Sequence, residues 1–312
     1  MISKNSKIFL AGHKGLVGSS VYRLLLSKGY KKVKIVDKKK LDLLNQNKVF
    51  EFLKNEKFEF IIIAAARVGG IKANNSFRAD FIYQNLQIQN NLIHGSYLNK
   101  VKKVIFLGSS CIYPKYCKQP MKESYLLTGK LEETNEPYAI AKIAGIKLCE
   151  NYNRQYKTNF ISLMPTNAFG IEDNFHPNNS HFLAAIIRKV LLAKKKKLKE
   201  IKLWGTGKVK REIMFVEDIA DACLFFLNKN TKHSLINIGS GYEKTIFEFS
   251  NIIKDLIYPE LKIKFDNNRD LDGVPRKLMD NNLARSYGWK SKSDIRHALK
   301  KTINNLDLKK IT

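Results

Sequence analysis

The side chains best suited to chemistry in this sequence follow one strand-like segment and one helix-like segment. The apolar run 104–108 leads to Ser109 and Cys111, and Tyr138 and Lys142 follow with a spacing of four. On a helix this spacing places the phenol and the ammonium on one face. A nearby cation favours the phenolate, so we expect a lowered pKa for Tyr138, as proton donation to a ketone requires. The hydroxyl of Ser109 can donate a hydrogen bond to the carbonyl oxygen of the same ketone. The alternatives are a half-buried tyrosine with an incidental lysine, and a cysteine that is a small buried hydrophobe.

A glycine-rich turn near the start of the chain has the form of a phosphate site. The run 7–11 predicts a short buried strand, and an amphipathic helix is expected to about Gly29. Between them the first glycine permits a tight turn, the second lets a pyrophosphate approach the backbone, and the third allows close packing of helix and strand. We therefore predict that this GxxGxxG turn binds a dinucleotide through Gly12, His13, Lys14, Gly15, Leu16, Val17 and Gly18.

The end of the second predicted strand, 33–36, bears on the choice of cofactor. Asp37 follows it directly, and three lysines come next, beginning with Lys38. An acid at this place accepts hydrogen bonds from the ribose hydroxyls of NAD, whereas basic residues neutralise the additional phosphate of NADP. Lys14 and Lys38 therefore favour NADP and Asp37 favours NAD. The alternative for these lysines is a solvated loop.

Short apolar segments alternate with helical ones, which predicts an α/β fold with a doubly wound parallel sheet of the Rossmann type. Ligands of such a sheet bind beyond the carboxyl ends of its strands. We expect a dinucleotide-binding domain over 1–166 and a smaller, mainly substrate-binding domain over 167–312, with parts of 212–241 returning to the first. Asn85, on the helix expected around 83–98, is either a buried, hydrogen-bonded amide or a surface residue.

Composition narrows the class of protein. The 312 residues carry a formal charge of +28, but the lysines are spread along the chain, so we do not expect a nucleic-acid partner. The densest run, 194–197, is expected at a solvated helix end, and a positive surface would attract a phosphate-bearing substrate. The sequence contains no long apolar run and no signal-peptide pattern, which favours a cytoplasmic protein with no membrane partner. The cysteines lack metal-site spacing and are expected to be free thiols: Cys111, Cys117, Cys149 and Cys223.

Five segments resemble those of one family, the GDP-L-fucose synthases among the extended short-chain dehydrogenases/reductases. They are GHKGLVG (12–18), GSSCIYP (108–114), NEPYAIAK (135–142), MPTN (164–167) and DNFHP (173–177). The resemblance extends from about residue 7 to about residue 289. It implies that GDP-4-keto-6-deoxy-D-mannose is epimerised at carbons 3 and 5 and then reduced at carbon 4 with NADPH. It also implies a homodimer built from the helices that hold Tyr138 and Asn85.

The resemblance also implies roles for particular residues. Cys111 and His181 would be the acid and base of epimerisation, which suits groups that titrate near neutral pH. Ser109, Tyr138 and Lys142 would polarise the ketone. Further cofactor contacts would come from Ala65, Asn85, Tyr138, Lys142, Pro165, Asn167 and His181, and contacts with the nucleotide sugar from Asn167, Lys189, Trp204, Arg211 and Lys277. Unaided, His181 could equally be a helix N-terminal residue, and Trp204 a core residue.

The sequence departs from the family pattern at two places. Asp37 precedes the lysines after the second strand, which weakens the case for strict NADPH use, and Lys189 stands where an arginine is expected. Three other functions remain open: formation of a different GDP-deoxyhexose, an epimerase or dehydratase that retains NAD, and a non-catalytic protein that binds dinucleotides or nucleic acid. The combination of Cys111 and His181 disfavours the second, and the complete catalytic set disfavours the third.

Overall fold

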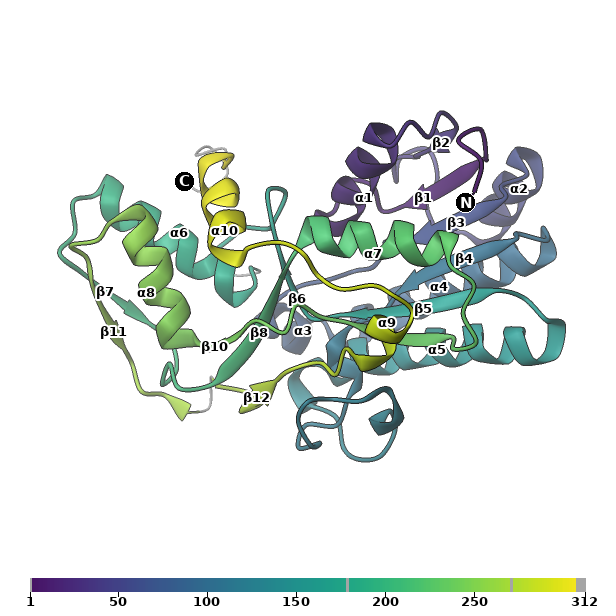
Figure 1. Cartoon of the computed structure of the whole chain (residues 1–312). Helices are drawn as coiled ribbons and strands as arrows, with labels where there is room; N and C mark the ends of the chain where they lie inside the picture. Colours follow the sequence, from purple (N-terminus) through teal and green to yellow (C-terminus); the bar gives the residue numbers. More distant parts are fainter. Residues whose placement is uncertain (1, 178–179, 270–271, 307–312) are drawn as a thin grey trace.

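The computed structural model describes residues 2–177, 180–269 and 272–306 of the chain. Its largest element is a parallel sheet of six strands in the order β2-β1-β3-β4-β5-β9 (Figure 1). The strands are β1 (Ile8–Ala11), β2 (Val33–Lys34), β3 (Phe60–Ile63), β4 (Lys103–Leu107), β5 (Phe160–Pro165) and β9 (Leu235–Ile238). β1, β3 and β4 are buried along their whole length, as expected for strands covered on both faces.

Helices cover both faces of this sheet. One face carries α1 (Leu16–Ser27) and α7 (Val216–Asn228), and the other carries α2 (Gln46–Glu56), α4 (Arg78–Leu98) and α5 (Glu136–Tyr156). Alternation along β1 shows the two layers: Ile8 and Leu10 join the core beneath α1 and α7, whereas Phe9 and Ala11 join the core beneath α2, α4 and α5. The predicted doubly wound α/β fold is therefore confirmed.

A second layered region lies beside the carboxyl ends of the main strands (Figure 1). In it β8 (Lys210–Phe215) pairs with β6 (Asn167–Phe169), β10 (Glu243–Thr245) and β12 (Arg276–Lys277), and β7 (Glu200–Leu203) pairs with β11 (Lys262–Phe265). A third core joins these strands to α6 (Phe182–Lys195), α8 (Ile246–Ile257) and α10 (Ile295–Asn304). The chain crosses between the regions more than once, because α7 and β9 follow β8 and pack in the main sheet layers.

Short elements complete the described chain. These are α3 (Ile71–Ser76), α9 (Asn282–Ser286) and three single turns of 3-10 helix, η1 (Ser110–Ile112), η2 (Glu123–Tyr125) and η3 (Glu133–Asn135). The segment after η1 is joined to the segment after β12, because the amide of Met121 donates to the carbonyl of Leu278 and the amide of Asp280 donates to the carbonyl of Met121. These bonds fix the position of β12 next to η1.

One sequence prediction about elements needs adjustment, and another is confirmed. The second strand was expected over 33–36 but contains only Val33 and Lys34, because β2 is an edge strand and Ile35 and Val36 line a surface pocket instead. The lysine run 194–197 lies at the exposed end of α6, as expected. Among the described residues, the helices are all too short or too polar to cross a membrane.

Candidate active site

One cleft at the carboxyl ends of the main strands holds most of the residues singled out in the sequence. Its volume is about 800 Å³. The turn after β1, the end of β4, the first turn of α5 and the N-terminus of α6 contribute to its wall. Of the predicted site residues it is lined by Gly12, His13, Lys14, Gly15, Leu16, Val17, Asp37, Lys38, Ala65, Ser109, Tyr138, Lys142, Pro165, Asn167 and His181.

The glycine turn has the geometry expected of a dinucleotide site. Gly12 has a φ of +89°, and a Cβ built there would lie 2.6 Å from the backbone nitrogen of Ala65. A Cβ on Gly18 would lie only 2.0 Å from the carbonyl oxygen of Gly12, so α1 packs directly on the turn. Gly15 is the N-cap of α1 and offers no capping side chain, which leaves the first N–H groups of the helix directed at the cleft for a pyrophosphate. The residues present therefore fit the predicted dinucleotide.

Lys142 is held in place by the backbone of β4. Its side chain is 3% exposed, and its Nζ donates a 2.7 Å hydrogen bond to the carbonyl oxygen of Leu107. The Nζ also lies 4.7 Å from the ring centroid of Phe106 and 5.7 Å from that of Tyr138. Burial lowers the pKa of Lys142 to about 8. The predicted Tyr138 and Lys142 pair on one helix face is therefore present.

The expected lowering of the Tyr138 pKa is wrong. Burial raises the pKa of Tyr138, and the neighbouring Cys111 raises it further. The physical reason is that Lys142 directs its ammonium at the Leu107 carbonyl, and burial weakens its own charge, so it does not offset the loss of water around the phenol. Tyr138 is thus a neutral phenol, which already carries the proton that a ketone would receive.

Cys111 lies in η1, next to the lining residues Ser109 and Ser110. The Oγ of Ser109 accepts a hydrogen bond from the amide of Cys111 at 3.4 Å, which ties the two catalytic candidates together. Burial raises the pKa of Cys111, while the ammonium of Lys277 and then the Ser109 hydroxyl act in the opposite direction. The described residues include no group of three or more His, Cys, Asp or Glu side chains that could hold a metal ion.

His181 forms the N-cap of α6, lines the cleft and is an exposed residue. Partial desolvation of the imidazole by the surrounding protein lowers the pKa of His181, and the positive charge of Lys277 lowers it further. The same ammonium therefore favours a thiolate at Cys111 and a neutral imidazole at His181. The imidazole of His181 is therefore able to accept a proton, whereas Cys111, whose pKa burial raises, remains a thiol that can donate one.

The residues expected to contact a nucleotide sugar come from the second region. Arg211 and Lys277 are register partners on β8 and β12, and Arg211 Nη2 donates to the carbonyl of Asp272 at 2.8 Å. Lys189 Nζ lies 5.0 Å from the ring centroid of Trp204, which is 63% exposed and so is not a core residue. Asn167 lines the cleft, whereas Lys189, Trp204, Arg211 and Lys277 lie outside the residues that line it.

Asn85 is the buried, hydrogen-bonded amide that the sequence allowed. Its Oδ1 accepts from the amide of Arg67 at 2.8 Å, and its Nδ2 donates to the carbonyls of Arg67 and Phe81 at 3.0 and 2.7 Å. It does not line the cleft, but Arg67 does. Asn85 therefore holds the loop that follows β3 in place.

Two site residues were missed by sequence reasoning. Asn74 is buried in the cleft wall, and its Oδ1 has no hydrogen-bond partner while its Nδ2 donates to the carbonyl of Gly69. Glu212 is fully buried behind Asn167, and its carboxylate accepts from the amides of Gly241 and Met279 at 2.7 and 2.9 Å. Burial raises the pKa of Glu212 to about 7. The Asn-Asn pair after two glycines was the one signal for Asn74.

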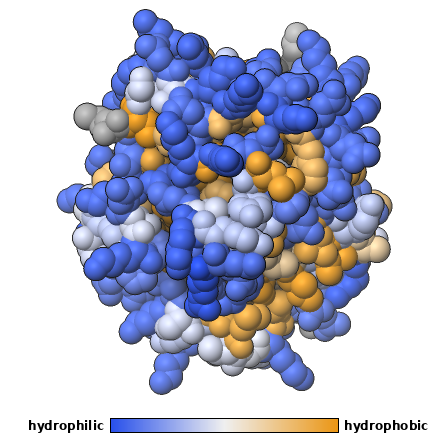
Figure 2. All heavy atoms as spheres, turned by 90° about the vertical axis from the view of Figure 1, so that its right-hand side faces the viewer, coloured by the Kyte–Doolittle hydropathy of each residue, from blue (hydrophilic) through white to orange (hydrophobic). Residues whose placement is uncertain are grey.

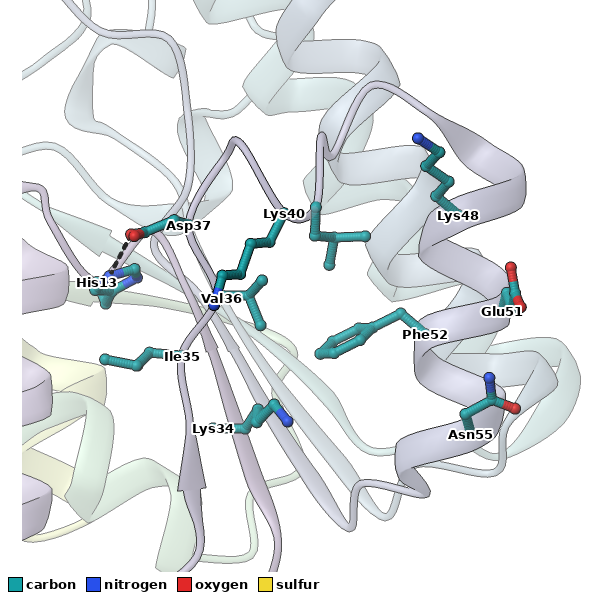
Figure 3. Close-up of a pocket in the computed structure, with 11 residues that line it drawn as sticks. His13, Lys34, Ile35, Val36, Asp37, Lys40, Lys48, Glu51, Phe52 and Asn55 are labelled. Atoms are coloured by element: carbon teal, nitrogen blue, oxygen red, sulfur yellow. Dashed lines mark ion pairs between the residues drawn. The ribbon is translucent and has the colours of Figure 1, made fainter.

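Asp37 and the glycine turn make a small cluster of charges at the far end of the cleft. The Oδ1 of Asp37 lies 2.7 Å from Lys14 Nζ and 3.3 Å from His13 Nε2. The hydrogen bond from Lys14 lowers the pKa of Asp37. A neighbouring pocket of about 610 Å³ shares His13 and Asp37 with the cleft, and Figure 3 shows these two side chains at its border.

Comparison with known proteins gives the family. A family model described as "NAD dependent epimerase/dehydratase family" matches residues 8–239. GDP-L-fucose synthase 1 of Arabidopsis thaliana is 49% identical over 302 residues, covering 97% of this chain and 93% of that protein. GDP-L-fucose synthase of Escherichia coli (strain K12) is 45% identical over 292 residues and 91% of each chain.

A solved structure has the same fold along nearly the whole chain. GDP-mannoheptose C4 reductase from Campylobacter jejuni with NADP bound is 36% identical, with a TM-score of 0.89 over 98% of this chain and 99% of that chain. The parallel sheet and the glycine turn at its first strand agree with these likenesses. The chain therefore belongs to the NAD dependent epimerase/dehydratase family and, within it, to the GDP-L-fucose synthases.

Proposed function

We propose that this protein converts GDP-4-keto-6-deoxy-D-mannose to GDP-L-fucose, by epimerisation at carbons 3 and 5 followed by reduction of the 4-ketone with NADPH. The observation that carries the proposal is the single cleft of about 800 Å³ in which the glycine turn, Ser109, Tyr138, Lys142 and His181 meet. A dinucleotide on the turn and a ketone near Tyr138 would share this cleft. The high identity to GDP-L-fucose synthases supports the choice of substrate.

Epimerisation requires a proton to leave one face of a carbon and another to arrive on the opposite face. Hydrogens beside a ketone are acidic because the resulting charge is delocalised onto the carbonyl oxygen, and a positioned acid and base accelerate the exchange. Cys111 and His181 take these roles from η1 and from the start of α6. Ser109 and Tyr138 donate hydrogen bonds to the developing oxyanion, which stabilises the enolate during both exchanges.

Reduction places charge on the same atom, the oxygen of the 4-ketone. When NADPH is bound on the glycine turn it supplies the hydride for carbon 4. Tyr138, protonated in this environment, gives its proton to the oxygen that becomes the hydroxyl. Lys142, fixed by the carbonyl of Leu107, keeps a positive charge beneath the phenol and stabilises the phenolate that remains. One set of residues thus serves both reactions, because charge develops on one atom throughout.

The nucleotide end of the substrate has its own set of residues. Arg211 and Lys277 lie side by side on β8 and β12, and we assign them to the diphosphate. Lys189 and Trp204, which are in contact through the indole ring, are assigned to the guanosine. An arginine at this position would bind a phosphate through two parallel hydrogen bonds. Lys189 supplies the positive charge but cannot form that bidentate contact.

The test is product analysis in deuterated water. The purified protein is incubated with GDP-4-keto-6-deoxy-D-mannose and NADPH or NADH, and the sugar is identified by NMR. We expect GDP-L-fucose with deuterium at carbons 3 and 5, formed mainly with NADPH. No turnover with either cofactor would refute the proposal.

A second candidate is reduction at carbon 4 without epimerisation, which the likeness to the Campylobacter jejuni C4 reductase favours. It predicts a reduced sugar that contains no deuterium at carbons 3 and 5. The same NMR experiment therefore separates the two candidates. The presence of both Cys111, buried directly behind the lining residue Ser110, and His181, which lines the cleft, favours the first.

We further propose a homodimer that forms through α4 and α5. The outer surfaces of these helices expose Tyr83, Leu98, Ile140 and Tyr156 at 63%, 50%, 41% and 44%. Figure 2 shows apolar side chains gathered low on the face it presents, at the height at which Figure 1 places α5. Sedimentation equilibrium should give twice the chain mass, and Ile140→Lys together with Leu98→Lys should give a monomer. A wild-type monomer at micromolar concentration would exclude the dimer.

We also place the protein in the cytoplasm and divide it at residues 166 and 167 into cofactor-binding and substrate-binding parts. The four cysteines are free thiols, as a reducing compartment requires. The division falls between β5 and β6, where the chain leaves the main sheet for the second one. Cell fractionation tests the first statement. Separate titration with NADP⁺ and with GDP, followed by hydrogen exchange, tests the second.

A further inference from the structure

Asp37 follows the second strand, at the position where the residue type distinguishes proteins of this fold that bind NAD from those that bind NADP. An acid there usually accepts hydrogen bonds from the two hydroxyls of the adenosine ribose. In this structure its Oδ1 lies instead 2.7 Å from Lys14 Nζ and 3.3 Å from His13 Nε2. Figure 3 shows Asp37 turned toward His13 rather than across the open pocket beside β2. The carboxylate is thus paired with the ammonium of Lys14 and lies beside the ring of His13 in the glycine turn.

Lys14, the ion-pair partner of Asp37, is also the lysine of the glycine turn that is available to bind a cofactor. The side chain of Lys14 is 73% exposed and lines the cleft, as do Lys38 and Lys39. NADPH carries an additional phosphate at the 2′ position of its ribose, and NADH does not. A phosphate that approaches Lys14 must share the ammonium with Asp37 and come close to a second negative charge, which raises its free energy.

We infer that Asp37 is an internal counter-ion that competes with the 2′-phosphate of NADPH for Lys14, and that it thereby narrows the enzyme's preference for NADPH over NADH. The inference rests on the proposed use of NADPH. It gives Asp37 a role different from that of a ribose ligand, because its negative charge weakens NADPH binding without strengthening NADH binding. Asp37 is then a residue that sets cofactor specificity.

The two roles predict opposite results for Asp37→Asn, a change that keeps the size of the side chain and removes its charge. If Asp37 is a counter-ion, its negative charge weakens binding of the 2′-phosphate, so Asp37→Asn should bind NADP⁺ about five- to twentyfold more tightly at low salt. The affinity for NAD⁺ should change less than about twofold, because NAD⁺ has no 2′-phosphate. Titration calorimetry with NADP⁺ and with NAD⁺ measures both without any turnover.

A double-mutant cycle locates the effect at Lys14. Lys14→Gln alone should weaken NADP⁺ binding, and in that background Asp37→Asn should no longer improve it, because the shared cation is gone. Glu51→Gln is the matched control. Glu51 is an exposed carboxylate that lines the neighbouring pocket but not the cleft, so its removal changes net charge alone. It should leave the ratio of the two affinities unchanged.

Several outcomes would overturn the inference. Weaker NAD⁺ binding by Asp37→Asn with unchanged NADP⁺ binding would make Asp37 a ribose ligand. An equal improvement in the Lys14→Gln background, or with Glu51→Gln, would show a general effect of charge. Wild-type protein that binds neither nucleotide would also refute the proposed function, whereas tight NADP⁺ binding without the Asp37 effect would refute this inference alone.

Discussion

Burial opposes ionisation at the centre of this active site. It raises the pKa of Tyr138 and of Cys111, and it lowers the pKa of Lys142 to about 8. The phenol is therefore ready to give a proton, whereas the thiol depends on Lys277 and Lys142 to become a base. In this pocket the charged forms are stabilised by specific neighbours rather than by water.

Reduction should depend on pH through Lys142. Its pKa of about 8 means that the ammonium is present below that pH and is lost as the pH rises through it. Because the ammonium stabilises the phenolate left after proton transfer, kcat/KM for NADPH oxidation should fall tenfold per pH unit above about 8. Steady-state assays from about pH 6 to about pH 10 test this. A profile that stays flat to pH 10 would contradict it.

Cys111 should be needed for epimerisation and not for reduction. In Cys111→Ser a weakly acidic hydroxyl replaces the thiol, so deuterium incorporation at carbons 3 and 5 should slow by about 10²- to 10⁴-fold. Binding of NADP⁺ should be unchanged, because Cys111 is separate from the glycine turn. NMR of the sugar in deuterated water measures the first and calorimetry the second. Cys223→Ser, at a fully buried thiol away from the cleft, is the matched control.

At the scale of elements, Glu212 joins three segments that surround the substrate side of the site. It lies on β8, and its carboxylate accepts from the amide of Gly241 before β10 and from that of Met279 after β12. Asn167 on β6 donates to the Glu212 carbonyl at 2.7 Å. A single buried side chain therefore sets how β12, with Lys277, lies against β8.

The stability of the fold should depend on pH through this carboxyl. Burial raises the pKa of Glu212 from 4.5 to about 7. The stabilising contribution of the protonated form is complete below about pH 4.5 and is lost as the pH rises through 7, which amounts to up to about 3 kcal/mol. Urea unfolding at about pH 5 and about pH 8 should show this loss in the wild type and not in Glu212→Gln. An equal loss in that variant would assign the dependence to other groups, and Glu51→Gln serves as the control.

Elements were predictable where the local sequence determines them, and contacts were not. The runs around β1, β3 and β4 are apolar because both faces of the sheet are covered, and the spacing of Tyr138 and Lys142 is a property of one helix. β2 is shorter than its apolar run because it lies at the edge. Pairing of Asp37 with Lys14 and burial of Glu212 join residues distant in the chain, so no local pattern shows them. The raised pKa of Tyr138 has the same origin.

At the scale of the whole molecule, the charge of +28 acts on substrates that carry phosphates. A positive surface increases the rate at which anions reach the cleft, and salt screens that attraction. The kcat/KM for the GDP-sugar should therefore fall several-fold as NaCl rises from about 0.05 to about 0.5 M. The kcat at saturation should change much less, since encounter no longer limits it. A kcat/KM independent of salt would show that the charge serves another purpose.

The repeated crossing of the chain between its two regions has a consequence for any attempt to separate them. A gene fragment ending at residue 166 would lack β9 beside β5 and would lack α7 over α1. It would also leave Lys103 buried without the carbonyls of Phe226 and Lys229 to which its Nζ donates. We therefore expect that neither fragment folds by itself and that only co-expression of both pieces would restore the binding of cofactor and sugar.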